Sequence, residues 1–333
     1  MSTRHTVRVI NRDDVLEVAS GATVLEAARS AGLPFPYGCQ IGRCGACKSR
    51  LLSGEVEHLA HTPFSLTVED RKHGLILACR AKPLSDCTVA WLGSDSEQPA
   101  SRQASGRVVS INRPVPDIAI IRVAVDGEPL GFHAGQYVEL GFEGCPARTY
   151  SMANHPRDPL LEFHVRLMPG GAVGGHIADR LRTGDAVRIQ GPMGNANLRL
   201  RRTGAIIAVA GGTGLAPILS ILKVASGFRL RQTVRLFLFG RHEASFYGLQ
   251  DIEALAPALP DFACVRLTGT RQARLEAFAA ALPVLAGASA YVAGSPALVD
   301  TTNAILSSRG LPDEHIFADA FVTSAELQPA RTG

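Results

Sequence analysis

The chain has 333 residues, which suggests two or three domains at about 150 residues each. Hydrophobic residues make up 46% of it and charged residues 19%, so each domain can bury a core and global disorder is excluded. The formal net charge is +4, and no basic stripe with interleaved aromatic residues occurs, so we expect no nucleic-acid partner.

The N-terminal segment MSTRHTVRVI lacks the apolar core of a signal peptide. No apolar run along the chain reaches the ~18 residues of a spanning helix, so we expect a soluble, cytoplasmic protein with no membrane partner. Residues 5–10 alternate like a strand, and the amphipathic stretch 22–32 predicts a helix that ends at Gly32. With a cysteine-bearing loop and further strands, they predict a small α+β domain over residues 1–92.

The chain contains 7 cysteines, and they are concentrated in its first part. An odd number in a cytosolic-looking chain argues against a disulfide framework and for metal or redox chemistry. Cys39, Cys44 and Cys47 have the spacing C-x4-C-x2-C, and Cys79 follows, which is the plant-type spacing for a [2Fe–2S] cluster. A four-cysteine zinc site or free thiols are the alternatives, although zinc would favour two separate C-x2-C hairpins.

Residues 5–92 resemble the plant-type ferredoxin domain, which has a β-grasp fold. The resemblance implies that Cys39, Cys44, Cys47 and Cys79 are the metal ligands. Three glycines in the loop allow it to fold closely around a cluster: Gly38, Gly42 and Gly45. The other cysteines match no ligand position, and we expect ordinary small apolar residues at Cys87, Cys145 and Cys264.

Residues 93–104 (GSDSEQPASRQA) are polar and have no apolar periodicity, which predicts a linker. Residues 105–201 alternate Val, Ile and Leu with polar residues and are interrupted by Gly and Pro, which predicts an antiparallel β-barrel. One of its strands carries an R-x-Y-S run, made of Arg148, Tyr150 and Ser151.

This run resembles the flavin-binding signature of the ferredoxin–NADP reductase superfamily. An arginine can clamp a pyrophosphate, and a tyrosine can pack on the isoalloxazine or ribityl chain. The hydroxyl of Ser151 is expected near flavin N5. The chemistry belongs to the cofactor, so we expect no catalytic triad or acid–base pair.

Two further motifs follow in the order that the resemblance implies. The next strand carries His164, Val165 and Arg166, and a glycine-rich turn then opens a helix with Gly171, Gly174 and Gly175. Such a turn is an anion site, because unpaired N–H groups and the helix dipole point toward a phosphate. The superfamily commonly has a serine at the position of Gly174. FAD is favoured over FMN, because a ligand with two phosphates fits both Arg148 and this turn.

From residue 205 continuous apolar strands alternate with helices, which predicts a doubly wound parallel sheet over residues 202–333. A glycine loop lies directly between the first strand and its helix, in the context that such a motif requires. It resembles the G-G-T-G-x-x-P loop of the same superfamily, which contacts the nicotinamide dinucleotide; the matching residues are Gly211, Gly212, Thr213, Gly214 and Pro217. Further matches follow later strands, at Gly240, Arg241, Ala293, Gly294, Ser295 and Pro296.

The choice between NADH and NADPH depends on two neighbouring residues. Arg241 could pair with a 2′-phosphate, whereas Glu243 could accept from a 2′-hydroxyl, and on the second ground we expect NADH. The superfamily often has a cysteine where this chain has Ala293. Phe317 and Phe321 lie where it places an aromatic residue over the flavin; Phe321 is the candidate cover, with a plain core role as the alternative.

Taken together, the three parts resemble the reductase component of a multicomponent bacterial oxygenase of the naphthalene dioxygenase reductase type. The resemblance implies that electrons pass from NADH through FAD and the [2Fe–2S] cluster to a terminal oxygenase component or to a separate ferredoxin, in the oxidation of aromatic compounds. The alternative is the reductase of a sugar-deoxygenation (hexulose dehydrase) system with the same cofactors.

Overall fold

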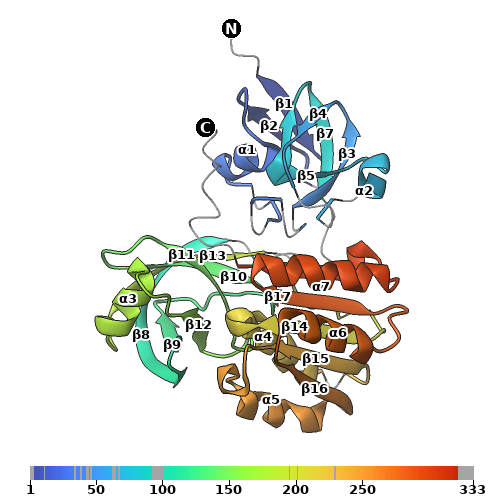
Figure 1. Ribbon diagram of the computed structural model, residues 1–333. Coiled ribbons are helices and arrows are strands. Elements are labelled where there is room, and N and C mark those ends of the chain that lie inside the picture. The colour runs from blue at the N-terminus through green and yellow to red at the C-terminus, as the bar shows by residue number, and fades with distance from the viewer. Residues whose placement is uncertain are drawn as a thin grey trace.

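The computed structural model describes residues 4–321, except residues 11, 34, 38, 39, 43, 44, 46, 62–64, 67, 92–98, 100, 195, 201 and 229. The predicted ligands Cys39 and Cys44 therefore lie outside the described residues. The described chain folds into three parts, which follow one another in the sequence and are coloured from blue to red in Figure 1.

The first part is a β-grasp domain. Its helix α1 (Val24–Ser30) begins at Thr23 in a capping box with Glu26 and packs on a sheet in which β1 and β7 run parallel. The strand order is β2-β1-β7-β3-β5, beside a separate pair β4-β6. The other elements are β1 (His5–Val9), β2 (Asp14–Val18), β3 (Lys48–Ser53), β4 (Val56–His58), α2 (Val68–Lys72), β5 (Leu75–Leu77), the 3₁₀ turn η1 (Ala78–Arg80), β6 (Ala81–Pro83) and β7 (Cys87–Trp91).

The second part is an antiparallel barrel with strand order β11-β10-β13-β8-β9-β12. A bridge between Met152 and Phe163 joins its two edges and nearly closes it. Its elements are β8 (Arg102–Val115), β9 (Ile118–Val125), β10 (Tyr137–Phe142), β11 (Arg148–Ser151), β12 (Leu160–Arg166), α3 (Ala172–Asp179) and β13 (Ala186–Met193). Strand β8 starts inside the predicted linker, because residues 102–104 pair with β13.

The third part is a parallel sheet with strand order β16-β15-β14-β17-β18. Residues of β14 alternate between two cores, one beneath α4 and α5 and the other beneath α6 and α7, so helices cover both faces. The elements are β14 (Ile206–Gly211), η2 (Gly212–Gly214), α4 (Leu215–Gly227), β15 (Thr233–Phe239), η3 (Glu243–Ser245), α5 (Leu249–Leu255), η4 (Ala256–Ala258), β16 (Asp261–Leu267), α6 (Arg271–Ala281), β17 (Ser289–Gly294), α7 (Pro296–Ser308), η5 (Asp313–His315) and β18 (Ile316–Ala320). The predicted fold class is confirmed for all three parts.

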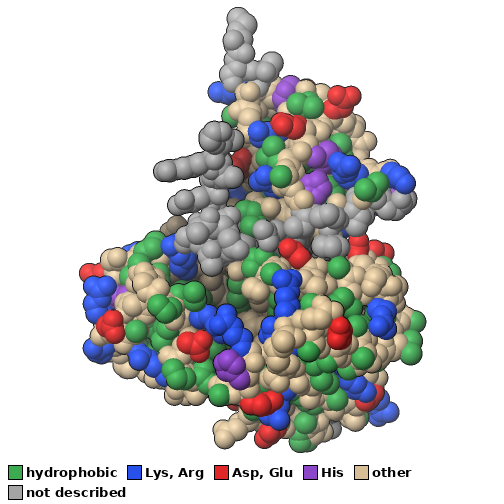
Figure 2. Space-filling view, viewed as in Figure 1, with side chains coloured by type: hydrophobic (Ala, Val, Ile, Leu, Met, Phe, Trp, Pro, Cys, Tyr) green, Lys and Arg blue, Asp and Glu red, His purple; other side chains and the backbone are tan. Residues whose placement is uncertain are grey.

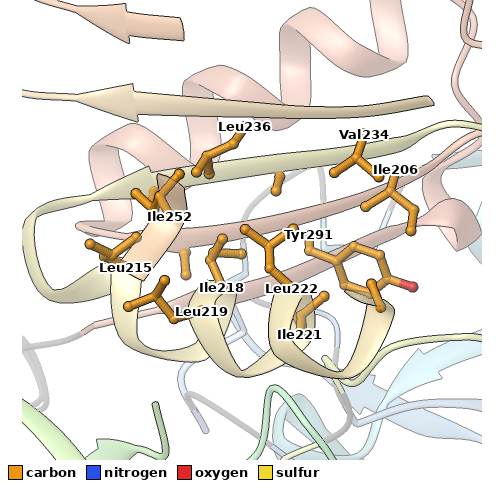
Figure 3. Close-up of a cluster of buried hydrophobic side chains, with 14 of the residues drawn as sticks. Ile206, Leu215, Ile218, Leu219, Ile221, Leu222, Val234, Leu236, Ile252 and Tyr291 are labelled. Atoms are coloured by element: carbon orange, nitrogen blue, oxygen red, sulfur yellow. The ribbon is translucent and has the colours of Figure 1, made fainter. Parts of the chain in front are cut away.

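Helix α4 is buried on both sides, and this joins the second part to the third. Figure 3 shows its apolar side chains, including Ile218 and Leu222, directed at the sheet. On the barrel side, Ser220 Oγ donates to the carbonyl oxygen of Asn154 (2.7 Å) and Lys223 Nζ to that of Ala153 (2.9 Å). The same core includes Ile118 of the barrel, so these two parts share buried apolar surface.

The first part lies over the barrel rim formed by β10, β11 and β13 (Figure 1). Tyr37, in the loop after α1, contacts Met193 at the end of β13, with 2.6 Å between the hydroxyl oxygen and the sulfur. Figure 2 shows acidic and basic side chains interspersed over the visible face. Within the described part of the chain, no helix is long and apolar enough to span a membrane.

Candidate functional site

The described part of the cysteine loop brings two predicted ligands together. Cys47 lies just before β3 and Cys79 lies in η1, and the backbone N–H of Cys79 donates to Cys47 Sγ at 3.4 Å. Both side chains are buried. Thiolates that receive backbone N–H donors are the ligands that an iron–sulfur cluster uses, so these residues fit such a group.

Gly42 shows why the loop needs glycine. Its φ is +75°, and a Cβ there would lie 2.8 Å from Arg80 Cγ and from His61 Cβ, so a side chain has neither the backbone conformation nor the space. Cys87 is elsewhere, on β7, where its thiol contacts the carbonyl oxygens of Glu55 and Ser85. Burial raises the pKa of the Cys87 thiol, which agrees with the expectation that Cys87 is an ordinary small apolar residue.

Strand β11 presents the R-x-Y-S run to two sides. Arg148 and Tyr150 share one face, because side chains of a strand alternate. Burial raises the pKa of Tyr150 to about 12, so its hydroxyl stays protonated. Arg148 Nη1 donates to the carbonyl oxygen of Ala147. A guanidinium carries five N–H donors, so Arg148 retains donors for a pyrophosphate.

Ser151 faces the third part of the molecule. Its hydroxyl is buried and donates to Asp319 Oδ2 on β18 at 2.8 Å. The backbone N–H of Phe321, two residues further on, donates to the carbonyl oxygen of Gly294. Asp319 of β18 thus reaches the predicted flavin neighbour Ser151, whereas the backbone of Phe321 is bonded to the end of β17. Phe317, also on β18, stacks on Tyr291 at 5.2 Å, with the guanidinium of Arg199 4.7 Å from its ring centre.

The glycine turn opens α3 as predicted. Gly171 is the N-cap, and a glycine has no side chain to cap the helix, so the first N–H groups point outward without intrahelical partners. A Cβ at Gly174 would lie 3.0 Å from the backbone nitrogen of Met168, which gives a physical reason for glycine where the superfamily has serine. The backbone N–H of Gly175 donates to the carbonyl oxygen of Gly171 within the helix.

Strand β12 distributes its three predicted contacts differently. The side chain of Val165 is buried in the barrel core, so only its backbone could meet a ligand. His164 lies on the other face, where Nδ1 is 2.8 Å from the hydroxyl oxygen of Tyr247. Arg166 pairs with Asp117 (3.2 Å), and its guanidinium lies beside Gly212, where a Cβ would be 2.9 Å from Nη2. His164 and Arg166 thus face the third part.

A cleft of about 900 Å³ lies at the carboxyl ends of β14 and β15, where open α/β sheets bind their ligands. Predicted nicotinamide-nucleotide contacts line it together with two predicted flavin contacts, Arg166 and Phe321; the nucleotide contacts are Gly211, Gly212, Thr213, Gly240, Arg241 and Ser295. One cleft therefore runs from the glycine loop to Phe321, beside the barrel strand β12.

Several predicted residues determine the course of the backbone around this cleft. A Cβ at Gly214 would lie 2.1 Å from the carbonyl oxygen of Ala293, so glycine lets the loop approach β17. Pro217 is buried in the first turn of α4. Ser295 caps α7 by accepting from the N–H of Leu298, and Pro296 is the first helical residue. At Gly294, before them, a Cβ would lie 3.3 Å from the backbone nitrogen and oxygen of Gly211, so glycine gives the loop room here too.

The charges around the cleft are mostly basic. Arg241 lines it together with Arg271 and Arg274 of α6, whose guanidinium groups donate to Thr301 Oγ1 and to the carbonyl oxygen of Gly240. Glu243 does not line it: its carboxylate pairs with Arg266 Nε at 3.5 Å on an exposed surface.

Several residues of this site were missed by sequence reasoning. Asp319 lies within IFADAF, in which only the phenylalanines match the superfamily pattern, and a carboxylate between two aromatics is the signal that could have found it. Tyr247, Arg271 and Arg274 line the cleft but follow no motif. Their positions depend on how α5 and α6 pack on the sheet.

Residues 8–84 match the family described as 2Fe-2S iron-sulfur cluster binding domain, and residues 105–198 match the family described as oxidoreductase FAD-binding domain. These matches confirm the predicted cluster and FAD. The residues of the two matched regions also fit the cluster and FAD. Two buried thiols lie together in the first part, and the second part contains both Arg148 and the uncapped N-terminus of α3.

Full-length relatives have the same organisation. The chain is 35% identical over 319 residues to the ferredoxin–NAD(P)+ reductase component of the naphthalene 1,2-dioxygenase/salicylate 5-hydroxylase systems of Ralstonia sp, covering 93% of this chain and 96% of that protein. It is 33% identical over 317 residues to the reductase component of the Pseudomonas putida naphthalene 1,2-dioxygenase system, covering 92% and 95%. The crystal structure of the Amycolatopsis cytochrome P450 reductase GcoB matches with TM-score 0.73 and 32% identity, covering 96% and 99%.

Proposed function

Because the chain belongs to the family of ferredoxin–NAD(P)+ reductase components that carry FAD and a [2Fe–2S] cluster, we propose that it draws electrons from NADH and delivers them to a terminal oxygenase component, or to its separate ferredoxin, in aromatic-compound oxidation. The observation that carries the proposal is the meeting of all three parts at one barrel rim. Tyr37 reaches it from the first part, and Asp319 reaches it from the third.

The chemistry that FAD would supply when bound is the conversion of a two-electron hydride donor into single electrons for the cluster. The chain supplies binding and orientation. Arg148 and the α3 N-terminus would hold the two phosphates, and Tyr150 would pack on the flavin. Ser151 would place its hydroxyl beside flavin N5. The hydroxyl donates its proton to Asp319 Oδ2, with 2.8 Å between the two oxygens.

Cofactor content is the first test. The purified protein should contain iron and acid-labile sulfide in the ratio of a [2Fe–2S] cluster, with FAD and without stoichiometric zinc.

The identity of the electron acceptor tests the proposal itself. With NADH, the protein should support turnover of a Rieske-type or di-iron aromatic oxygenase, and omission of the reductase should abolish that turnover. If it reduces small acceptors but supports only a sugar-deoxygenating dehydrase, the oxygenase assignment is wrong.

The preference for NADH rests on Glu243, in the loop that follows β15. The carboxylate of Glu243 pairs with Arg266 outside the cleft lining, but turned toward the cleft it would accept from a 2′-hydroxyl bound beside Arg241 and would repel a 2′-phosphate there. Glu243→Ala should therefore raise kcat/KM with NADPH and lower it with NADH, each by roughly three- to tenfold, the scale of one hydrogen bond. Steady-state kinetics with both nucleotides measures this.

Glu253→Ala, at an exposed position on α5, is the matched control and should leave both values unchanged. Arg241→Ala distinguishes further between a preference for NADH and a preference for NADPH. A selective loss of activity with NADPH, from a wild-type protein that already prefers NADPH, would contradict the assignment of NADH.

A further inference from the structure

Tyr37 and Met193 form a contact between the ferredoxin domain and the barrel, at 2.6 Å between the hydroxyl oxygen and the sulfur. We propose that these two are positioning residues, which seat the ferredoxin domain on the barrel rim from which it receives electrons. The inference rests on the proposed function, because it concerns the internal step between the flavin and the cluster.

The ferredoxin domain fixes the orientation of Tyr37 from its own side. The guanidinium of Arg29, in the last turn of α1, lies 5.0 Å from the centre of the Tyr37 ring, and a cation in this position is attracted to the ring face. Arg29 also donates to Gln40 Oε1, which ties the loop on the far side of Tyr37 to the same helix. The ring packs against the core of the domain. Its hydroxyl is therefore aimed outward from a fixed base.

The barrel fixes Met193 in a similar way. Met193 ends β13, is only 6% exposed and is paired with Tyr137 of β10. Tyr137 is paired in turn with Ser151 of β11. The strand register thus places Met193, Tyr137 and Ser151 side by side across three neighbouring strands, at the rim that Figure 1 shows beneath the first part.

The far end of this row and Tyr37, which contacts its near end, belong to successive steps of the proposed electron path. Ser151 is the predicted neighbour of flavin N5, and Tyr37 lies two residues before the predicted ligand Cys39. The contact therefore joins the flavin side of the barrel to the cluster side of the ferredoxin domain. Electron transfer slows as the distance between donor and acceptor grows, so a contact that fixes this distance affects the step without taking part in it.

The test uses the full chain with Tyr37→Phe, Met193→Leu and the double variant. Phenylalanine keeps the ring over Arg29 and removes the hydroxyl, and leucine keeps the volume of Met193 and removes the sulfur. Val15→Ala, at an exposed position on β2, is the control. The flavin-to-cluster step is followed by anaerobic stopped-flow absorbance after mixing with NADH. Amide hydrogen exchange in the segments 133–142 and 186–194 is measured on the same proteins.

Each single variant should slow the flavin-to-cluster step by about three- to tenfold, as expected for one lost hydrogen bond, and leave ferricyanide reduction unchanged. Exchange should increase in both barrel segments. The double variant should be no slower than the worse single variant, because both changes remove one contact.

Unchanged exchange and an unchanged step in both single variants would overturn the inference, and so would effects that multiply in the double variant. Failure of the proposed function gives a different result. In that case the wild-type protein reduces no oxygenase, while the exchange measurement still shows whether Tyr37 and Met193 hold the two domains together.

Discussion

Replacing Arg148 with alanine is expected to release FAD on dilution while the iron–sulfur absorbance persists. Arg148 shares one face of β11 with Tyr150, and its guanidinium can donate two parallel hydrogen bonds to two oxygens of a phosphate. Hydrogen bonds to charged groups are worth about 1.5–3 kcal/mol each, which corresponds to a loss of about 10- to 150-fold in FAD affinity. Flavin fluorescence of the filtrate after ultrafiltration measures the released FAD.

Two other variants define this effect. Arg148→Lys keeps the charge but loses the planar fork, so it should retain FAD better than alanine and worse than the wild type. Arg107→Ala, on β8 of the same barrel, removes a guanidinium that contacts the carbonyl oxygen of Gly184 and should keep full occupancy. Full FAD occupancy in Arg148→Ala would remove Arg148 from the binding site.

Glu162→Gln is expected to destabilise the boundary between the barrel and the third part. Arg122 Nε lies 2.8 Å from one oxygen of the buried carboxylate, and Lys223 Nζ lies 3.6 Å from the other. Burial by itself raises the pKa of Glu162, but the His164 imidazole at 3.5 Å, the charge of Lys223 and the hydrogen bond from Arg122 outweigh it and lower the pKa to about 2.

This pKa sets both the size and the pH range of the effect. A carboxylate with a lowered folded-state pKa stabilises the fold above its ordinary value of 4.5, and the stabilisation disappears as the pH falls toward about 2. A shift of this size corresponds to about 3 kcal/mol at neutral pH. Urea unfolding should therefore show a large deficit for Glu162→Gln at pH 7 and a much smaller one near pH 3.

Glu143→Gln, at an exposed position after β10, is the matched control and should unfold like the wild type at both pH values. An equal deficit for Glu162→Gln at pH 7 and near pH 3 would show that lost packing, and not the charge of Glu162, causes the destabilisation.

The fold was predictable where local chemistry decides it. The stretch 22–32 was expected to be helical and contains α1 (Val24–Ser30), which follows from Thr23 and Glu26 at its start and from Gly32 just after its end, where φ is +71°. The continuous apolar strands of the third part identify a sheet that is covered on both faces. The start of β8 was not predictable, because residues 102–104 are held by β13, more than eighty residues away in the sequence.

The site was predictable for backbone motifs and less so for side chains. The glycine loop after β14 lies in the cleft, since its position depends on a strand, a turn and a helix in direct succession. His164 and Glu243 have partners that no local pattern reveals, namely Tyr247 across the domain boundary and Arg266 on a neighbouring strand. Asp319 joins Ser151 across 168 positions of sequence, and only the packing of β18 beside the barrel brings them together.

The electron order NADH, FAD, cluster, partner is tested most directly by comparing two acceptors in the intact protein, in Cys79→Ser and in a fragment. The fragment should start at Ser101, because β8 begins at Arg102. It contains the barrel and the third part, which share a core, so it should fold and bind FAD. We predict that the fragment and Cys79→Ser keep ferricyanide reduction and lose most cytochrome c reduction. Cytochrome c reduction by the fragment at the rate of the intact protein would show that electrons do not leave through the cluster, and the proposed order would be wrong.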